Sequence, residues 1–227
     1  MSWAPLVLSL QIATIAMIIS VVVGTALAVV LAWKRLPLPD LFHALVSTPL
    51  VLPPTVLGYY LLVSLGPHSL VGRAWHALFG ADIAFTFTGA VVAATVGSLP
   101  LVIGAVRVGL DAIDPNLIAA ARTLGAKPMR VLATVTLPLA SPGIIAGAML
   151  GFARALGDYG MTQMIASERF NGLFGIQNTS PASIFVYDEL VAMREDAARN
   201  MAIATTALGI AMLFLANRLT RRLHRAR

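Results

Sequence analysis

Long apolar runs alternate with short polar segments along the whole chain. Each run is long enough to cross the roughly 30 Å hydrocarbon core of a bilayer as a helix. The spans are predicted at about 6–33, 42–65, 83–106, 142–165 and 197–216. The pattern therefore predicts an all-α integral membrane protein with about five transmembrane helices, forming a single transmembrane domain over residues 1–227.

The second run is interrupted by residues that disturb a helix, namely Pro49, Pro53, Pro54 and Gly58. Each proline removes a backbone donor, so this helix is predicted to be bent or locally unwound. Irregular backbone at membrane depth is tolerated only against protein or a water-lined path. These four residues are candidates for a gate or translocation path, and a kink that serves packing alone remains the alternative for any single proline.

The fourth run poses a problem of length. With Ser141 as cap and Pro142 as first residue, a helix ending at Leu156 would rise only about 22 Å, which is too short to span. We therefore expect it to continue, bent at two glycines, to about Ile165. The glycines are Gly157 and Gly160.

That helix would place Arg154 and Asp158 one turn apart on one face. An arginine at the bilayer centre costs about 3 kcal/mol on insertion scales, so a partner or an aqueous path is expected. Two hypotheses stay open. The pair lines the translocation path, where Arg154 helps to accommodate an anion, or it is a structural ion pair that locks a helix bend.

A polar segment between the third and fourth runs carries its own helix signals. Asp114 suits the cap, Pro115 the first helical position and Gly125 the left-handed residue beyond the end, which predicts a helix over 115–124. This helix is too short to be stable alone in water, so it needs a partner. Its apolar positions share one face, whereas Arg122 lies elsewhere. They are Leu117, Ala120, Ala121 and Leu124.

The remaining segments add less. Residues 66–82 are predicted to be an outer loop, with His68 and His76 as surface residues rather than metal ligands. The third run has a small-residue face suited to close helix contact. It consists of Gly89, Ala93, Ala94 and Gly97. A short amphipathic helix at the outer surface is predicted within 167–194, from Ile184, Tyr187, Leu190 and Val191.

Composition and charge support the membrane assignment. The 227 residues are 58% hydrophobic and 11% charged, and the absence of cysteine excludes disulfides and thiolate metal sites. The net charge of +6 comes from basic residues at the ends of apolar runs, which favours a membrane protein in contact with lipid over a nucleic-acid binder. An outer N-terminus and a cytoplasmic C-terminus place most of them inside. These are Lys34, Arg35, Arg107, Arg122, Lys127, Arg130 and five arginines from Arg218 to Arg227.

The polar loop also carries a recognisable spacing. Ala120 and Ala121, three free positions, Gly125, nine free positions, then Val135-x-Leu137-Pro138 resemble the cytoplasmic loop of bacterial ABC importer permeases, with Ala119 where that family usually has Glu. The resemblance implies a coupling helix that docks into a groove of an ATPase subunit. The residues expected to carry coupling are Asp114, Pro115, Leu117, Ala120, Ala121, Arg122, Leu124 and Gly125.

Three further stretches resemble the molybdate branch of those permeases. They are PLVLPP in the second run, FTFTGAVVAATVGSLPL in the third and FARALGDYG in the fourth. The resemblance implies a type I ABC importer permease fold in the bacterial inner membrane. It also implies a second copy of the chain, a pair of ATP-binding cassette subunits, and a periplasmic or surface oxyanion-binding protein as partners.

The chain is not expected to be an enzyme. It lacks a G-x-x-x-x-G-K-[ST] loop, so ATP and Mg are expected on the partner ATPase and no cofactor on this chain. Tungstate and sulfate remain alternatives to molybdate as substrate. A gradient-driven secondary transporter would need carboxylates near the bilayer midplane and repeated halves, and neither is visible. A membrane scaffold without transport would leave the polar loop unexplained.

Overall fold

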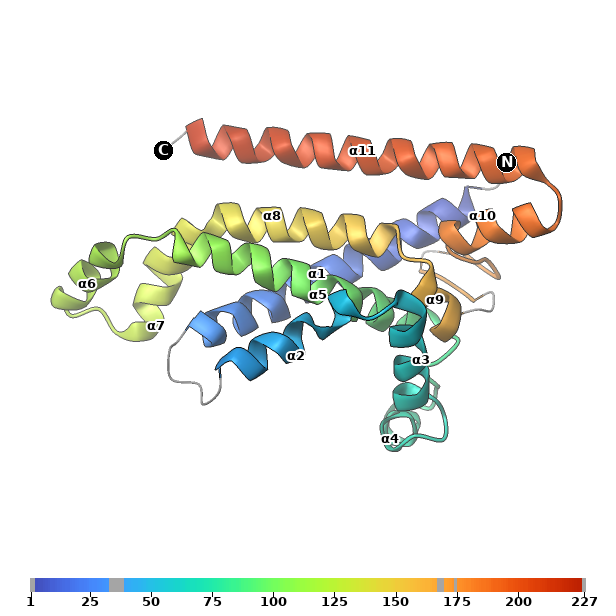
Figure 1. Cartoon of the computed structure of the whole chain (residues 1–227), viewed down its shortest axis with the longest axis horizontal. Helices are drawn as coiled ribbons and strands as arrows, with labels where there is room; N and C mark the ends of the chain where they lie inside the picture. The colour runs from blue at the N-terminus through green and yellow to red at the C-terminus, as the bar shows by residue number, and fades with distance from the viewer. Residues whose placement is uncertain (1–2, 33–38, 167–169, 174, 226–227) are drawn as a thin grey trace.

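The computed structural model describes residues 3–32, 39–166, 170–173 and 175–225, and these are helical almost throughout (Figure 1). The long helices are α1 (Ala4–Ala32), α5 (Phe87–Asp111), α8 (Leu137–Leu156) and α11 (Glu195–Arg225). The shorter ones are α2 (Pro39–Val51), α3 (Pro54–Leu65), α4 (Leu70–Phe79), α6 (Pro115–Thr123), α7 (Pro128–Val131), the π-helical turn η1 (Leu132–Thr136), α9 (Gly160–Ile165) and α10 (Ala182–Val191).

Four helical segments of the described chain are long and apolar enough to cross a membrane. They cover Ala4–Ala32, Phe87–Asp111, Pro128–Leu156 and Glu195–Phe214. A fifth span results if α2 and α3 are counted as one bent unit. This architecture confirms the predicted all-α membrane fold, with bounds that differ from the predicted ones by a few residues for the first, third and fifth spans.

Helix α5 packs against both α1 and α8 at the centre of the bundle, and these two helices also contact each other. Its small residues Gly89, Ala93, Ala94 and Gly97 are all buried, so this face allows close contact as predicted. The hydroxyls of Ser20 on α1 and Ser98 on α5 lie 2.9 Å apart and hydrogen-bond in the buried interface. A polar pair of this kind satisfies both hydroxyls where no water is available.

The second span is broken, as its prolines predict. Helix α2 ends at Val51, α3 begins at Pro54, and the two axes differ by 117°. Pro53 between them is extended, with φ −55° and ψ 136°, because the residue before a proline is driven out of the helical region. Pro54 then occupies the first helical position, where its missing N–H costs nothing.

The prediction for the fourth span is wrong at both ends. The helix ends at Leu156 instead of continuing to Ile165, and it gains its length by starting at Pro128. Ser141 is therefore not a cap. Its hydroxyl donates to the carbonyl of Pro138 at 2.8 Å. In a regular helix this carbonyl would accept from the amide of residue 142, but Pro142 has no N–H. The wide turn of η1 precedes Pro138 and accommodates its ring within the continuous span.

The segment 66–82, predicted to be an outer loop, lies between the second and third spans and contains the short helix α4, which was not predicted. The predicted short helix near residue 184 is α10, in which Ile184 is buried while Tyr187, Leu190 and Val191 are exposed. Several predicted positions lie outside the described residues. These are Trp33, Lys34, Arg35, Arg169 and Arg227.

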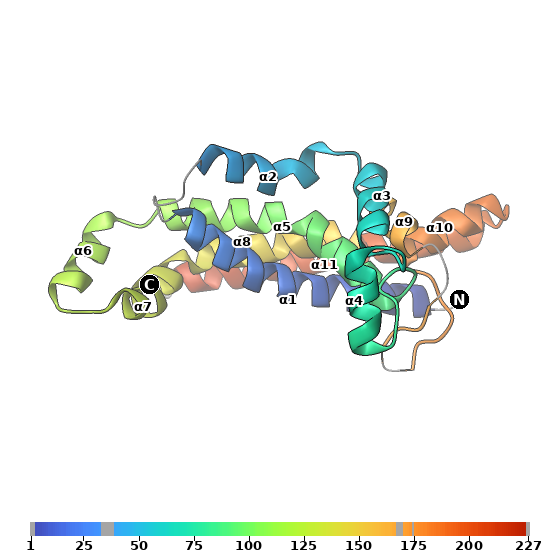
Figure 2. The same ribbon diagram turned by 90° about the horizontal axis from the view of Figure 1, so that it is seen from below.

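The molecule has two distinct ends along its long helices (Figures 1 and 2). One end, here called the loop end, carries α6, α7 and the C-terminus. The other, here called the N-terminal end, carries the N-terminus together with α3, α4, α9 and α10. The long span from Pro128 to Leu156 connects the two ends directly.

Candidate functional site

Helix α6 at the loop end is closed at both termini by its own residues. The Asp114 carboxylate accepts a hydrogen bond from the amide of Asn116 at 2.9 Å, and Pro115 is the first helical residue. Gly125 has a φ of +81°. The amides of Gly125 and Ala126 donate to the carbonyls of Arg122 and Ala121, at 3.0 and 3.2 Å. These two bonds form a Schellman motif, which requires the left-handed residue that glycine supplies.

No residue of α6 is buried. Leu117 is 48% exposed and Leu124, its C-terminal cap, is 88% exposed. Ala120 on the same face is exposed as well. A nine-residue helix with an uncovered apolar face is not stable through its own hydrogen bonds. The face formed by Leu117, Ala120, Ala121 and Leu124 is therefore suited to a partner outside the described chain.

A groove of about 780 Å³ lies behind α6, between this helix and the ends of the spans. Ile118 and Arg122 line it from α6, and Leu110 and Asp111 line it from α5. Arg122 thus lies on the side of α6 opposite to Leu117. It therefore does not share the apolar face formed by the other residues of α6 that are predicted to carry coupling.

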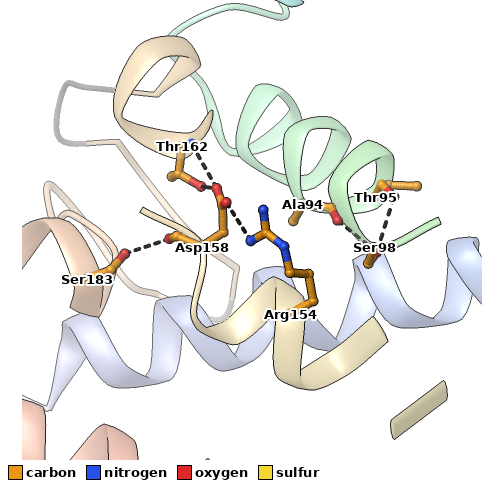
Figure 3. Close-up of polar contacts among 7 residues, drawn as sticks. All are labelled: Ala94, Thr95, Ser98, Arg154, Asp158, Thr162 and Ser183. Carbon is orange, nitrogen blue, oxygen red and sulfur yellow. Dashed lines mark hydrogen bonds and ion pairs between the residues drawn. The ribbon is translucent and has the colours of Figure 1, made fainter. Parts of the chain in front are cut away.

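The N-terminal end contains the ion pair between Arg154 and Asp158, at the break between α8 and α9 (Figure 3). The Asp158 side chain is 1% exposed, and it accepts from Arg154 Nη1 at 2.9 Å. Its second oxygen accepts from the amide and the hydroxyl of Thr162, at 3.0 and 2.8 Å. Asp158 therefore accepts from one free amide in the first turn of α9 and binds the end of α8 at the same time.

A further hydrogen bond ties this break to α10. The hydroxyl of Ser183 donates to the backbone carbonyl of Asp158 at 2.8 Å (Figure 3). The Arg154 side chain is 27% exposed and extends toward α5. Its Nη2 would lie 3.8 Å from a Cβ added at Gly97. This is an ordinary van der Waals distance, whereas the same Cβ would overlap the terminal methyl of Met161, so Gly97 leaves room for the Met161 side chain.

Helices α3 and α9 approach each other at two glycines. A Cβ on Gly58 would lie 2.9 Å from the Cα of Met161, and a Cβ on Gly160 would lie 2.9 Å from the Cβ of Pro54. Both distances are shorter than real carbon contacts, so neither position admits a side chain without displacing a helix. The second half of the broken second span, α3, is therefore joined at the N-terminal end to α9, the short helix that follows α8.

The structure brings some of the predicted residues together and separates others. Pro54 and Gly58 contact α9, close to the pair of Arg154 and Asp158. Pro49 lies inside α2, before the break, and Pro53 is exposed at the break itself. The residues proposed for coupling all lie at the opposite end of the molecule.

Two residues that hydrogen-bond to Asp158 were not predicted from the sequence, namely Thr162 and Ser183. The four-residue spacing from Asp158 to Thr162 is a local signal that could have identified the first. Ser183 lies 25 residues from Asp158 and has no local signal.

Residues 20–227 match the family of binding-protein-dependent transport system inner membrane components. The chain belongs to this family. Among its relatives, the molybdenum transport system permease protein ModB of Escherichia coli K12 is 38% identical over 219 residues, which cover 96% of this chain and 93% of that protein. The proteins of the same name from Haemophilus influenzae and Azotobacter vinelandii are 36% and 37% identical, over 96% and 91% of this chain and 93% and 89% of theirs.

Solved structures of other transport system membrane components share the fold. A chain of the methionine ABC transporter MetNI, in an inward-facing conformation, superimposes with a TM-score of 0.77 at 19% identity, and 98% of this chain and 99% of that chain are covered. A chain of a bacterial alginate ABC transporter gives a TM-score of 0.70 at 14% identity, with 96% and 78% covered. These comparisons confirm the predicted type I importer permease fold.

Proposed function

We propose that this chain is the membrane-spanning permease of an ABC importer that carries molybdate into the cytoplasm. The observation that carries the proposal is similarity to ModB permeases over nearly the whole length of both chains. The exposed apolar face of α6, at the motif spacing of such permeases, adds an independent physical argument, because that face needs a partner surface.

ATP hydrolysis belongs to a separate subunit in this proposal. A pair of ATP-binding cassette subunits covers the α6 faces of two copies of the chain, and an oxyanion-binding protein delivers its ligand at the N-terminal end. The N-terminus then lies outside and the C-terminus in the cytoplasm, in agreement with the positive-inside rule. ATP and Mg are held by the cassette subunits, and this chain supplies the path.

Coupling follows from the covalent order of the elements. Helix α6 is followed by α7, η1 and α8, and α8 ends at the Arg154–Asp158 pair. When the cassette subunits close on ATP, α6 moves with them, and the span from Pro128 to Leu156 transmits the displacement to the break at the far end. There α9 and α3 are joined through Gly58 and Gly160, so the second half of the broken second span moves with α9.

In this scheme Arg154, Asp158, Pro49, Pro53, Pro54 and Gly58 belong to the path or its gate. Arg154 offers a positive charge to a passing oxyanion, since only one of its terminal nitrogens contacts Asp158. The buried Asp158, in contrast, is occupied by three hydrogen bonds and holds the break in place.

The experiment that tests the proposal measures ATPase activity of the purified permease and cassette complex in lipid. Binding protein loaded with molybdate, tungstate or sulfate is added in turn, and unloaded binding protein is the control. Stimulation by the molybdate-loaded form is expected. Stimulation by the sulfate-loaded form alone would assign the chain to the sulfate permeases instead of the molybdate permeases. If no cassette subunit co-purifies, the coupling role of α6 is wrong.

A further inference from the structure

Helix α4 is a complete short helix at the N-terminal end, between the second and third spans. Ser69 caps it, since its hydroxyl accepts from the amide of Gly72 at 2.8 Å. Gly80 ends it in the left-handed conformation with a φ of +69°, and its amide donates to the carbonyl of His76 at 2.8 Å. Ten residues with closed ends are still too few for a stable isolated helix in water.

The apolar residues of α4 gather on one side of the helix. Leu70 and Leu78 are 79% and 78% exposed, and Phe79 is 63% exposed. The ring of Trp75 lies beside that of Phe79, with centroids 4.1 Å apart. The two polar side chains, Arg73 and His76, lie on the other side of the helix.

Protein contact involves only a narrow edge of α4. Gly72 is buried, and a Cβ added there would overlap the carbonyl oxygen of Gly66, so α4 packs through backbone at this point. His76 Nδ1 lies 3.0 Å from an Asp82 carboxylate oxygen at the surface. The apolar face lies away from this edge and is uncovered by the described chain.

The direction of α4 differs from that of the spans. The long helices run horizontally in both Figure 1 and Figure 2, whereas α4 is seen end-on in the first and along its length in the second. Helix α4 therefore lies across the spans. Since the spans cross the bilayer, α4 runs parallel to the membrane surface, beside the end of the spans where the N-terminus lies.

We infer that α4 is an interfacial helix that inserts its apolar face into the adjacent lipid leaflet. A helix that lies in the membrane plane, with aliphatic and aromatic residues on one side and basic or polar residues on the other, is the arrangement that binds the boundary of headgroups and acyl chains. Trp75 and Phe79 add the aromatic rings that favour this boundary. Arg73 lies where it can reach lipid phosphates.

Lipid accounts for this surface better than a protein partner does. Helix α3, on which Tyr59, Tyr60 and Val63 are also exposed, leads directly into α4 along the chain, and a ten-residue helix parallel to the membrane places its whole apolar face at one depth. A soluble partner would cover an apolar face at any inclination of the helix. A second copy of the chain that covers α4 is distinguished from lipid by the test below.

The test uses the natural absence of cysteine in the chain. Leu78→Cys and Leu70→Cys report on the apolar face, and His76→Cys is the matched control on the polar face. Each variant is purified with its cassette subunit and reconstituted into vesicles of phosphatidylethanolamine and phosphatidylglycerol. Retention of the cassette subunit shows that the variant is folded. Two apolar positions are used so that the test can still be made if one of these variants does not fold.

A membrane-impermeant maleimide is expected to modify Leu78→Cys about tenfold more slowly than His76→Cys, because the apolar face is immersed. A fluorophore attached to the Leu78→Cys variant by a small apolar reagent is then expected to be quenched by lipids that carry a nitroxide on the acyl chain. Equal maleimide rates at both positions would overturn the inference. Protection from maleimide without lipid quenching would also overturn it, and would assign the face to a second copy or another protein.

Discussion

Two short helices lie at opposite ends of one long span, and they are held in different ways. Helix α6 is closed by its own caps, Asp114 and Gly125, and buries none of its residues. Helix α9 has six residues, of which four are buried, and its start is closed by Asp158. A helix shaped by local bonds keeps a free surface for another subunit, whereas a helix shaped by long-range packing is part of the core.

The largest effect is expected from Asp158→Ala. This change leaves Arg154 without its partner and the start of α9 without its acceptor, so we expect a loss of about 3 kcal/mol or more. The apparent Tm of the purified chain in detergent should fall by roughly 6–12 °C. Asp188→Ala is the matched control, because Asp188 is exposed on neighbouring α10. An unchanged Tm for Asp158→Ala would show that α9 is not held through this carboxylate.

A change at the loop end is expected to act on assembly instead of on the chain. Gly125→Val forces a β-branched residue toward a φ of +81°, at a cost of about 1–2 kcal/mol. The end of α6 should relax, and affinity for the cassette subunit should fall about tenfold with loss of ATP-driven uptake. Gly104→Val is the control, because Gly104 is exposed and a Cβ added there meets nothing within 4 Å. Uptake at the level of this control would disprove the role of the Schellman motif in coupling.

The smallest effect on stability is expected from Arg154→Gln, which separates the two hypotheses for the ion pair. Glutamine retains a donor for Asp158 and removes the charge. If Arg154 serves the path, uptake in vesicles should fall severalfold while the complex assembles normally, as judged by co-purification of the cassette subunit. A complex that fails to assemble would assign Arg154 a structural role only.

Local signals explain what was predictable from the sequence. The caps of α6 and the break before Pro54 depend on neighbouring residues, and both were predicted. The length of the fourth span was not, because Pro138 and Pro142 are helix-starting residues by local rules. Their accommodation depends on the η1 turn and on the Ser141 hydroxyl, which become apparent only in the folded helix.

The contacts around the break were less predictable. Asp158 was paired correctly with Arg154, but its bonds to Thr162 and from Ser183 depend on the end of α8 at Leu156. Helix α4 was missed although Leu70, Ala74 and Leu78 recur at helical spacing. Its length and its basic residues are typical of a loop. Only its orientation across the spans indicates that the exposed apolar face lies parallel to the membrane surface.

The length of α8 sets the scale of movement between the two ends. Twenty residues at 1.5 Å each make a rod of about 30 Å. If this rod pivots at η1 by about 5°, its far end sweeps about 2.6 Å, close to the radius of a helix backbone cylinder. If the proposed gate lies at the break after α8, a small angular input at α6 is enough to change the width of the path by about the size of an oxygen atom.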